Sequence, residues 1–246
     1  MSVEVPPERA EEARAAMLEL FPEGFEESER PGSVQLAAYT NAQGEERLWH
    51  VFGGARSEDV PDGWEDRWRT FHKPVRVGRL WIGPPWETLD PDLEAVVIDP
   101  GRAFGTGAHP TTRLCLDLLQ RVEPGSLVDV GCGSGVLSIA AALLGFAPVT
   151  GVDVEEAAVE ATSENARVNG VEVTALLVAP DAALPAASVG VANISLDGVL
   201  EIGRRLDVDV LITSGYLVSA DVDIDGYMHV ERIADGAWAA DLHRRA

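Results

Sequence analysis

The sequence predicts an α/β protein in which a doubly wound, largely parallel sheet follows a small N-terminal α+β domain. From about residue 92 onward, strand-like and helix-like segments alternate, as crossover connections between parallel strands require. A glycine-rich turn at 129–135 lies directly after an apolar strand-like run and directly before an alanine-rich, helix-like run. Residues 1–60 show a shorter, different pattern of strands and helices, which indicates a separate unit.

The first 60 residues predict the small α+β domain. We expect a short strand at 3–5, a helix at 7–20, a strand at 33–40 and the end of a second helix at 47–52. The apolar residues of the first helix recur at helical spacing, at Ala10, Ala13, Met17 and Leu20.

Residues 61–86 predict a linker between the two domains. The segment contains Trp64, Trp68, Trp81 and Trp86, four of the six tryptophans, interleaved with arginines and the lone lysine of the chain. Because tryptophan is a large apolar side chain that usually becomes buried, we expect these indoles to pack between two lobes. A surface that faces the substrate is the alternative.

Residues 87–246 predict the main domain. The expected strands are 95–98, 127–130, 149–152, 173–177, 189–194 and 208–213. The expected helices are 111–122, 135–144, 155–169 and 196–205. Residues 228–234 and 238–243 flank Asp235-Gly236 and predict a hairpin, so the sheet should end in antiparallel strands.

The strongest local signal is the run Asp129-Val130-Gly131-Cys132-Gly133-Ser134-Gly135. Glycines at the end of a strand let the backbone turn sharply and let a ligand approach closer than a Cβ would permit. A dinucleotide fingerprint is G-x-G-x-x-G, whereas here the glycines run G-x-G-x-G and Val136 holds the sixth position. Asp153 ends the next predicted strand, where a carboxylate can accept two hydrogen bonds from a ribose diol. These features favour S-adenosylmethionine over NAD, with a purely structural glycine turn as the other alternative.

A second glycine-rich segment, residues 99–112, runs into a predicted helix start. Pro110 suits the first helical turn, and the free amides there, together with the helix dipole, favour a carboxylate such as the methionine end of that cofactor. Thr111 and Thr112 add hydroxyl groups at the same helix start. Simple N-capping by a threonine is the structural alternative.

A third signal is Asn193, which ends the otherwise apolar strand predicted at 189–194. The carboxyl end of a central parallel strand faces the ligand crevice, so the side-chain oxygen of Asn193 can accept a hydrogen bond from an incoming amine. A structural asparagine in a turn is an equal alternative.

At these residues the chain resembles the family of methyltransferases that modify ribosomal protein L-eleven (L11) of the large subunit. The similarity runs from the tryptophan-rich segment at 64–68, through 73–76 and the 99–112 loop that ends His-Pro-Thr-Thr, to the glycine turn and the strand end at 191–194. It covers roughly residues 62–215. The resemblance implies a class I, Rossmann-like methyltransferase that uses S-adenosylmethionine to methylate protein amines. It also implies a ferredoxin-like N-terminal domain for substrate recognition.

Carried over position by position, the resemblance implies the site residues. The expected cofactor contacts are Phe104, Thr106, Thr112, Gly131, Gly133, Asp153 and Asn193. Phe104 and Thr106 would belong to a loop that closes over the site. Thr111, beside Asn193, would face the amine to be methylated, so Asn193 and Thr111 are the expected catalytic residues. His109 is the local candidate for a general base, and capping of the loop is its alternative role.

Composition limits the partners and the location. The chain of 246 residues has 19 Lys+Arg against 41 Asp+Glu and a formal net charge of −22, which argues against binding to a phosphate backbone and favours a basic protein substrate. No run approaches the ~18 consecutive apolar residues of a membrane span, so we expect a cytoplasmic monomer that binds neither membrane nor nucleic acid directly. We also expect reduced Cys115 and Cys132, and no metal site.

Two other functions remain open from the sequence. One is a methyltransferase of the same fold that acts on a different basic protein. The other is a non-catalytic protein that binds S-adenosylmethionine.

Overall fold

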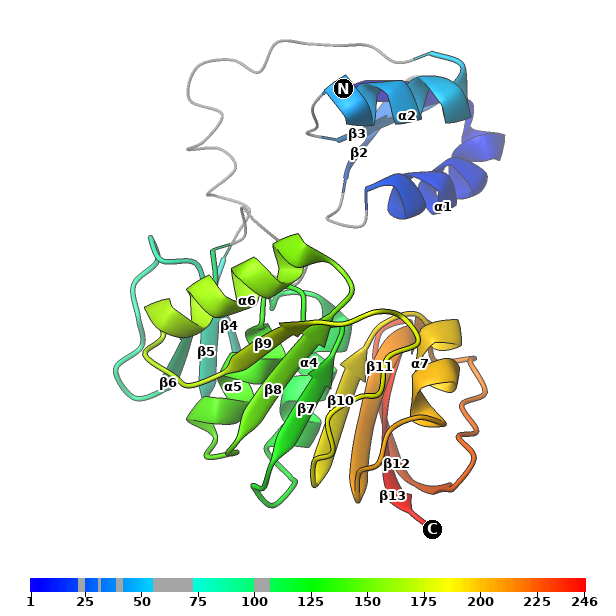
Figure 1. Ribbon diagram of the computed structural model, residues 1–246. Helices are drawn as coiled ribbons and strands as arrows, with labels where there is room; N and C mark the ends of the chain where they lie inside the picture. Colours follow the sequence, from blue (N-terminus) through cyan, green and yellow to red (C-terminus); the bar gives the residue numbers. More distant parts are fainter. Residues whose placement is uncertain (22–24, 31, 39–41, 55–72, 100–106) are drawn as a thin grey trace. The chain divides into compact units, whose positions relative to one another are not determined.

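The computed structural model describes residues 1–246 apart from 22–24, 31, 39–41, 55–72 and 100–106 (Figure 1). The chain divides into two compact units, Met1–Trp68 and Arg69–Ala246. The finer limits expected from the sequence, at 1–60, 61–86 and 87–246, stay predictions.

Within its described residues, the first unit is a three-stranded antiparallel sheet with two helices (Figure 1). Its elements are β1 (Ser2–Val5), the 3-10 turn η1 (Pro7–Arg9), α1 (Ala10–Leu20), β2 (Glu26–Arg30), β3 (Ser33–Ala37) and α2 (Ala42–Phe52). The strand order is β1-β3-β2, and Met17, Leu36 and Leu48 are fully buried in a core shared by both helices and the central strand. The order β-α-β-β-α matches the first five elements of a ferredoxin-like fold, an assignment that itself stays a prediction.

A seven-stranded mixed sheet dominates the second unit (Figure 1). Its strands are β7 (Leu127–Val130), β8 (Val149–Asp153), β9 (Thr174–Leu177), β10 (Val189–Asn193), β11 (Val210–Leu217), β12 (Tyr227–Asp235) and β13 (Trp238–Arg245). They are ordered β12-β13-β11-β10-β7-β8-β9. Strands β7 to β11 run parallel, whereas β13 pairs antiparallel with β11 and with β12. The predicted α/β sheet with an antiparallel terminal hairpin is therefore confirmed.

Helices and loops cover both faces of this sheet. The helices described in the second unit are α4 (Pro110–Leu119), α5 (Val136–Leu143), α6 (Glu156–Val168) and α7 (Leu196–Gly203). Alternate strand residues point to opposite faces, so Leu127 packs with α4 and α5, whereas its neighbour Val128 packs with α7. The central parallel strands are thus buried on both sides, which explains their nearly continuous apolar sequences.

A second, three-stranded sheet in this unit corrects one expectation. It consists of β4 (Val75–Val77), β5 (Leu80–Gly83) and β6 (Glu94–Val97), with β5 central, antiparallel to β4 and parallel to β6. The strand predicted at 95–98 is β6, and its assignment to the main parallel sheet was wrong. Leu80 and Ile82 bury their side chains in the core shared with α4 and α5, so this segment covers the helix layer instead of extending the main sheet.

The segment predicted as a tryptophan-rich linker is partly described. Strands β4 and β5 lie within it, and Trp81 of β5 is 5% exposed, so this indole packs inside the second unit. Trp86 is half-buried. Trp64 and Trp68 lie outside the described residues.

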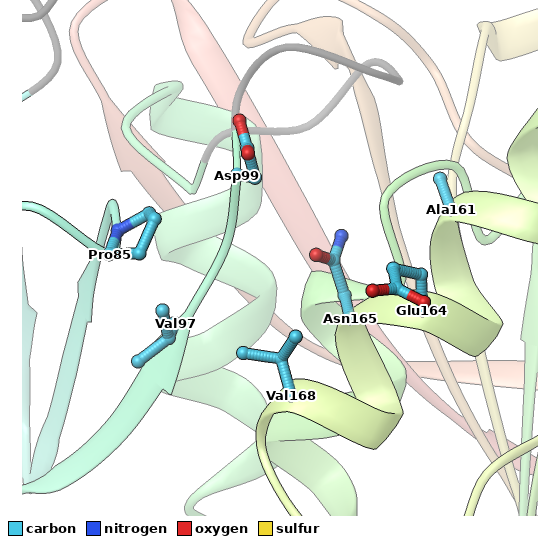
Figure 2. A pocket seen from close by; sticks show the side chains of 7 residues that line it. All are labelled: Pro85, Val97, Asp99, Ala161, Glu164, Asn165 and Val168. Carbon is cyan, nitrogen blue, oxygen red and sulfur yellow. The ribbon is translucent and has the colours of Figure 1, made fainter.

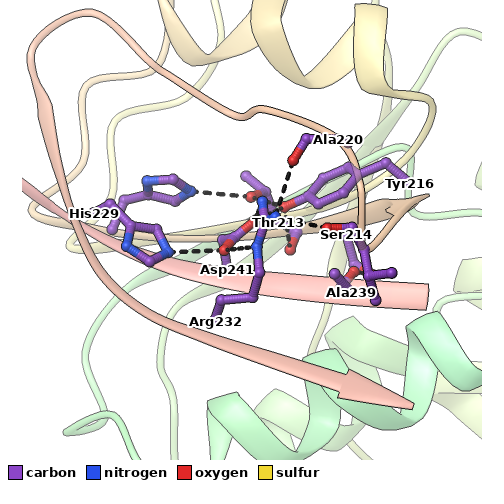
Figure 3. Close-up of polar contacts among 10 residues, drawn as sticks. Thr213, Ser214, Tyr216, Ala220, His229, Arg232, Ala239 and Asp241 are labelled. Atoms are coloured by element: carbon purple, nitrogen blue, oxygen red, sulfur yellow. Dashed lines mark hydrogen bonds and ion pairs between the residues drawn. The ribbon is translucent and has the colours of Figure 1, made fainter. Parts of the chain in front are cut away.

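A buried polar cluster joins β11, β12 and β13 (Figure 3). The fully buried carboxylate of Asp241 accepts hydrogen bonds of 2.8 Å from Arg232 at both oxygens, from the Tyr216 hydroxyl at one, and contacts the His229 ring at 2.8 Å. Burial alone would raise the pKa of Asp241, but the bonds from Arg232, Tyr216 and His229 outweigh it and hold this pKa below its usual value. Arg232 also donates to the carbonyl of Ala220, at 2.9 Å, so the cluster holds the segment after β11 against the hairpin of β12 and β13.

Candidate functional site

The glycine turn connects the end of β7 to the start of α5. Gly131 has a φ of +76°, in the left-handed region that favours glycine. A Cβ at this position would overlap the Cγ2 of Ile194, which follows the last residue of β10. The turn therefore packs directly against the carboxyl end of the neighbouring strand β10. A side chain at position 131 would prevent this close packing.

Asp153, the last residue of β8, is bonded to this turn. Its Oδ2 accepts a hydrogen bond of 3.0 Å from the amide of Gly133, and its Oδ1 accepts one of 3.0 Å from the amide of Glu155. The side chain is thus fixed at the carboxyl edge of the sheet, where β7 and β8 lie side by side. Each carboxylate oxygen retains capacity for a further donor, as recognition of a ribose diol requires.

Helix α4 begins at the same edge of the sheet, with Pro110 at its first position as expected. Its N-cap is His109, whose Nδ1 accepts a hydrogen bond from the amide of Thr111 at 3.4 Å and lies 2.7 Å from the Thr111 hydroxyl. The cap is therefore supplied by a histidine, and the sequence alternative of a threonine cap does not apply.

Asn193 and Thr112 meet across the end of β10. The Nδ2 of Asn193 donates to the Thr112 hydroxyl at 3.3 Å, although 81 positions separate the two residues in the chain. Thr112 is 1% exposed, whereas Asn193 is half-buried. This contact orients the carboxamide so that its nitrogen faces α4, which leaves the oxygen available as an acceptor. The hydroxyl of Thr111 contacts His109, and its expected place beside Asn193 stays a prediction.

His109 has a weakly basic ring. Burial first, and then the nearby Arg113 guanidinium, lower the pKa of His109 below its usual value, so the neutral form predominates at neutral pH. Its Nδ1 already accepts from Thr111, and its ring packs edge-on against Trp238 with the ring centroids 4.9 Å apart. These contacts support the capping role over that of a general base.

The edge hairpin, formed by β12 and β13, contacts the start of α4 through two of its side chains. Arg113, one turn into the helix, forms an ion pair and hydrogen bond with Asp235, which ends β12. Trp238, which begins β13, packs against His109 as described. The turn between β12 and β13 thus contacts the helix start that carries Thr111 and Thr112.

Asp129 is a candidate residue that sequence reasoning missed. It is 1% exposed on β7, and its Oδ2 accepts hydrogen bonds from the Ser138 amide at 3.1 Å and the Ser138 hydroxyl at 2.7 Å. Its Oδ1 is buried and has no hydrogen-bond partner among the described residues. Burial raises the pKa of Asp129 to about 6, against the lowering effect of the Ser138 bonds, and the nearby charge of Asp153 adds to the rise. The available signal was an acidic residue within the otherwise apolar run Leu-Val-Asp-Val.

Phe104 and Thr106 lie outside the described residues. Cys115 and Cys132 are free and buried, and burial raises the pKa of Cys132 to about 12, so its thiol stays protonated. In the part of the chain that the structure describes, no group of three or more His, Cys, Asp or Glu side chains is arranged to hold a metal ion. Likewise, no helix among the described residues is both long and apolar enough to cross a membrane.

The sheet order and the glycine turn are those of class I methyltransferases. A solved structure of the ribosomal protein L11 methylase from Lactobacillus delbrueckii subsp. bulgaricus matches with a TM-score of 0.59 and 29% identity, covering 70% of this chain and 98% of that one. The family model for ribosomal protein L11 methyltransferase (PrmA) matches residues 10–239. The chain therefore belongs to the ribosomal protein L11 methyltransferase family, and the resemblance inferred from the sequence is confirmed.

Curated relatives agree with this assignment. The chain is 40% identical over 205 residues to a ribosomal protein L11 methyltransferase of Geobacter metallireducens, covering 77% of this chain and 67% of the relative. It is 45% identical over 141 residues to one from Caldanaerobacter subterraneus, covering 52% of this chain and 46% of the relative. The chain thus spans from about half to two thirds of the length of these relatives.

Proposed function

We propose that the chain is an S-adenosylmethionine-dependent protein N-methyltransferase that methylates lysine side chains, α-amines or both on ribosomal protein L11. The observation that best supports this proposal is the hydrogen bond from the Gly133 amide to the Asp153 carboxylate, which joins the glycine turn to the acidic end of β8. Family membership supports the same reaction. We place this reaction in the cytoplasm, with the enzyme acting as a monomer.

The described residues fit the proposed cofactor. Gly131 lets the glycine turn pack closely against Ile194 at the end of β10, and the Asp153 carboxylate bonded to this turn is an acceptor for ribose hydroxyls. Thr112 lies in the first turn of α4, where free amides and the helix dipole favour a carboxylate. When bound, S-adenosylmethionine supplies an electrophilic methyl group on a sulfonium sulfur.

Asn193 is the proposed catalytic residue that orients the amine. Its nitrogen is engaged by Thr112, so its oxygen can accept an N–H of the incoming amine and hold the nitrogen lone pair in one direction. A lysine amine has an unperturbed pKa of about 10.4 and must lose a proton before it attacks, which removal from water favours. His109 serves as the helix cap, so the proton passes to solvent. A direct contact of Thr111 with the amine stays a prediction.

The substrate is proposed from charge and domain organisation. With a net charge of −22, the chain favours a basic protein over a nucleic acid. The first unit, with its β-α-β-β-α order, is the proposed recognition domain of ferredoxin-like type.

Intact-mass analysis of purified ribosomal proteins, incubated with the enzyme and S-adenosylmethionine, tests the proposal. We expect L11 to gain one or more methyl units, and the Asn193→Ala variant to lose this activity. A mass shift on another basic protein, with none on L11, would mean that the other protein is the substrate. Cofactor binding without any methylated product would leave a non-catalytic binding protein.

A further inference from the structure

A cavity of about 310 Å³ lies between α6 and the segment around β6, within the second unit (Figure 2). It is lined by Pro85, Val97, Asp99, Ala161, Glu164, Asn165 and Val168. None of these residues belongs to the set assigned above to the cofactor or the amine. The cavity nevertheless adjoins the glycine turn, because the Asn165 Nδ2 donates to the Ser134 carbonyl at 2.9 Å.

The walls of this cavity are held in place from both sides. Asn169 of the α6 C-terminus accepts a hydrogen bond from the Val97 amide and donates one to the Val97 carbonyl, both at 2.7 Å. Asn165 is 6% exposed, and its amide is anchored on Ser134. The lining is therefore fixed by hydrogen bonds between β6, α6 and the glycine turn before any ligand binds.

Three of the described residues that line the cavity carry oxygen acceptors. Asp99 and Glu164 contribute carboxylates, and Asn165 contributes its carboxamide oxygen, which faces the cavity in Figure 2. Since the Asn165 nitrogen is taken by Ser134 and no hydrogen bond among the described residues reaches its Oδ1, this buried side chain presents an acceptor without a donor. Glu164 also forms an exposed ion pair with Arg167 at 2.7 Å, of a kind that contributes little and can exchange with another cation.

The other described residues of the lining are apolar. Pro85, Val97, Ala161 and Val168 form the walls between the acceptors. A ligand that fits both features has an aliphatic stem and a cationic head. A lysine side chain has this form, and its ammonium group carries three donors that can point to three separate acceptors. The flat guanidinium of arginine instead suits two oxygens in one plane.

We propose that this cavity binds a lysine side chain of the basic protein substrate and anchors that protein beside the site of methyl transfer. The proposal rests on the proposed function for the source of the lysine. The anchored lysine differs from the methylated amine, because the cavity lies on the α6 side of the glycine turn and the Asn193–Thr112 pair lies at the α4 side.

The test is a two-dimensional NMR titration of the full chain with N-acetyl-lysine N-methylamide. Its norleucine analogue has a similar stem without the charge, and its arginine analogue carries a planar charge. We expect the lysine compound to shift the amide signals of Val97 and Asn165 in a saturable manner, and the norleucine compound to leave them unchanged. Equal binding of norleucine, tighter binding of arginine, or no saturable shift would each overturn the proposal.

Variants locate the binding. Asp99→Asn and Glu164→Gln should each weaken lysine binding roughly tenfold, as loss of a charge-assisted hydrogen bond predicts. Val168→Phe, at a position 52% exposed, should fill the cavity and abolish binding without disturbing the core. Glu160→Gln changes an exposed charge on the same helix outside the lining and should have no effect. Equal weakening by Glu160→Gln and Glu164→Gln would mean general attraction to the acidic surface and would overturn the assignment.

The titration needs neither S-adenosylmethionine nor methyl transfer, so its failure is distinct from failure of the proposed function. Methylation of L11 together with a failed titration would keep the enzyme assignment and remove the anchor site. Saturable lysine binding without methylation of any protein would keep the site.

Discussion

The buried carboxylate of Asp129 should make the stability of the protein depend on pH in an unusual direction. Its pKa is raised from 3.8 to about 6 because burial disfavours the charged form. A carboxyl group whose pKa is raised in the folded state contributes stability below its unfolded pKa and loses that contribution as the pH rises through the folded value. The shift corresponds to about 3 kcal/mol in the free energy of unfolding, lost between about pH 4 and pH 7.

The Asp129→Asn variant isolates this contribution. Its carboxamide oxygen can still accept from Ser138, but the side chain no longer titrates. We expect the free energy of unfolding of the variant, relative to the unmodified protein, to rise by about 2 kcal/mol as the pH increases from 4.5 to 7.5. Urea unfolding, followed by circular dichroism at several pH values, measures this difference.

A matched control is Asp223→Asn, which removes a carboxylate from an exposed position. The free energy of unfolding of Asp129→Asn, relative to the unmodified protein, should change more with pH than that of this control. If the relative free energy of unfolding of Asp129→Asn changed with pH no more than that of Asp223→Asn, Asp129 would not be the buried, proton-binding group that the structure indicates, and the reasoning would be refuted.

Three further predictions concern the sheet and the cofactor site. Gly131→Ala should lower the free energy of unfolding by more than the ~1–2 kcal/mol of left-handed strain alone, because the new Cβ would overlap Ile194. Gly145→Ala is the control, because Gly145 also has a positive φ but has open space around it. Equal shifts of the melting temperature in the two variants would contradict the predicted overlap at Gly131. Burial lowers the pKa of His243 from 6.5 to about 4, so about 3 kcal/mol of stability should disappear as the pH falls from about 6.5 to 4. His243→Gln should flatten this acid limb in urea unfolding, and an unchanged limb would count against it. Asp153→Asn should weaken S-adenosylmethionine binding roughly tenfold or more in calorimetry, by loss of a charge-assisted acceptor, while unaltered affinity would remove Asp153 from the site.

Much of the main sheet could be predicted because its central strands are buried on both faces. Runs such as Leu127–Val130 and Val189–Asn193 are therefore apolar except for Asp129 and Asn193, and they stand out in the sequence. Strand β2, by contrast, has the sequence Glu-Glu-Ser-Glu-Arg and no apolar alternation. It is an edge strand held by backbone pairing with β3, which leaves no hydrophobic pattern to detect. The membership of β6 in a separate sheet likewise depends on long-range pairing with β5 and not on its own residues.

The same distinction applies to the candidate site. The closeness of Asp153 to the glycine turn follows from two sequential strands that pair in parallel, so local patterns could predict it. The Asn193–Thr112 contact joins residues 81 positions apart and depends on how α4 packs on the sheet. The sequence could not decide between a capping role and a general-base role for His109, because capping depends on the orientation of its ring. Asp129 was missed because its importance comes from burial, which a single acidic letter does not reveal.

The link between the edge hairpin and α4 has a consequence for synthesis of the protein. Asp235, which pairs with Arg113, lies 122 positions later in the chain, and Trp238 lies later still. While the polypeptide is growing on a ribosome, the helix that carries Thr112 must wait for these supports to leave the exit tunnel. We therefore expect nascent chains that stop before residue 235 to contain a folded glycine turn but an insecure helix start, and so to gain full ligand affinity only late in translation.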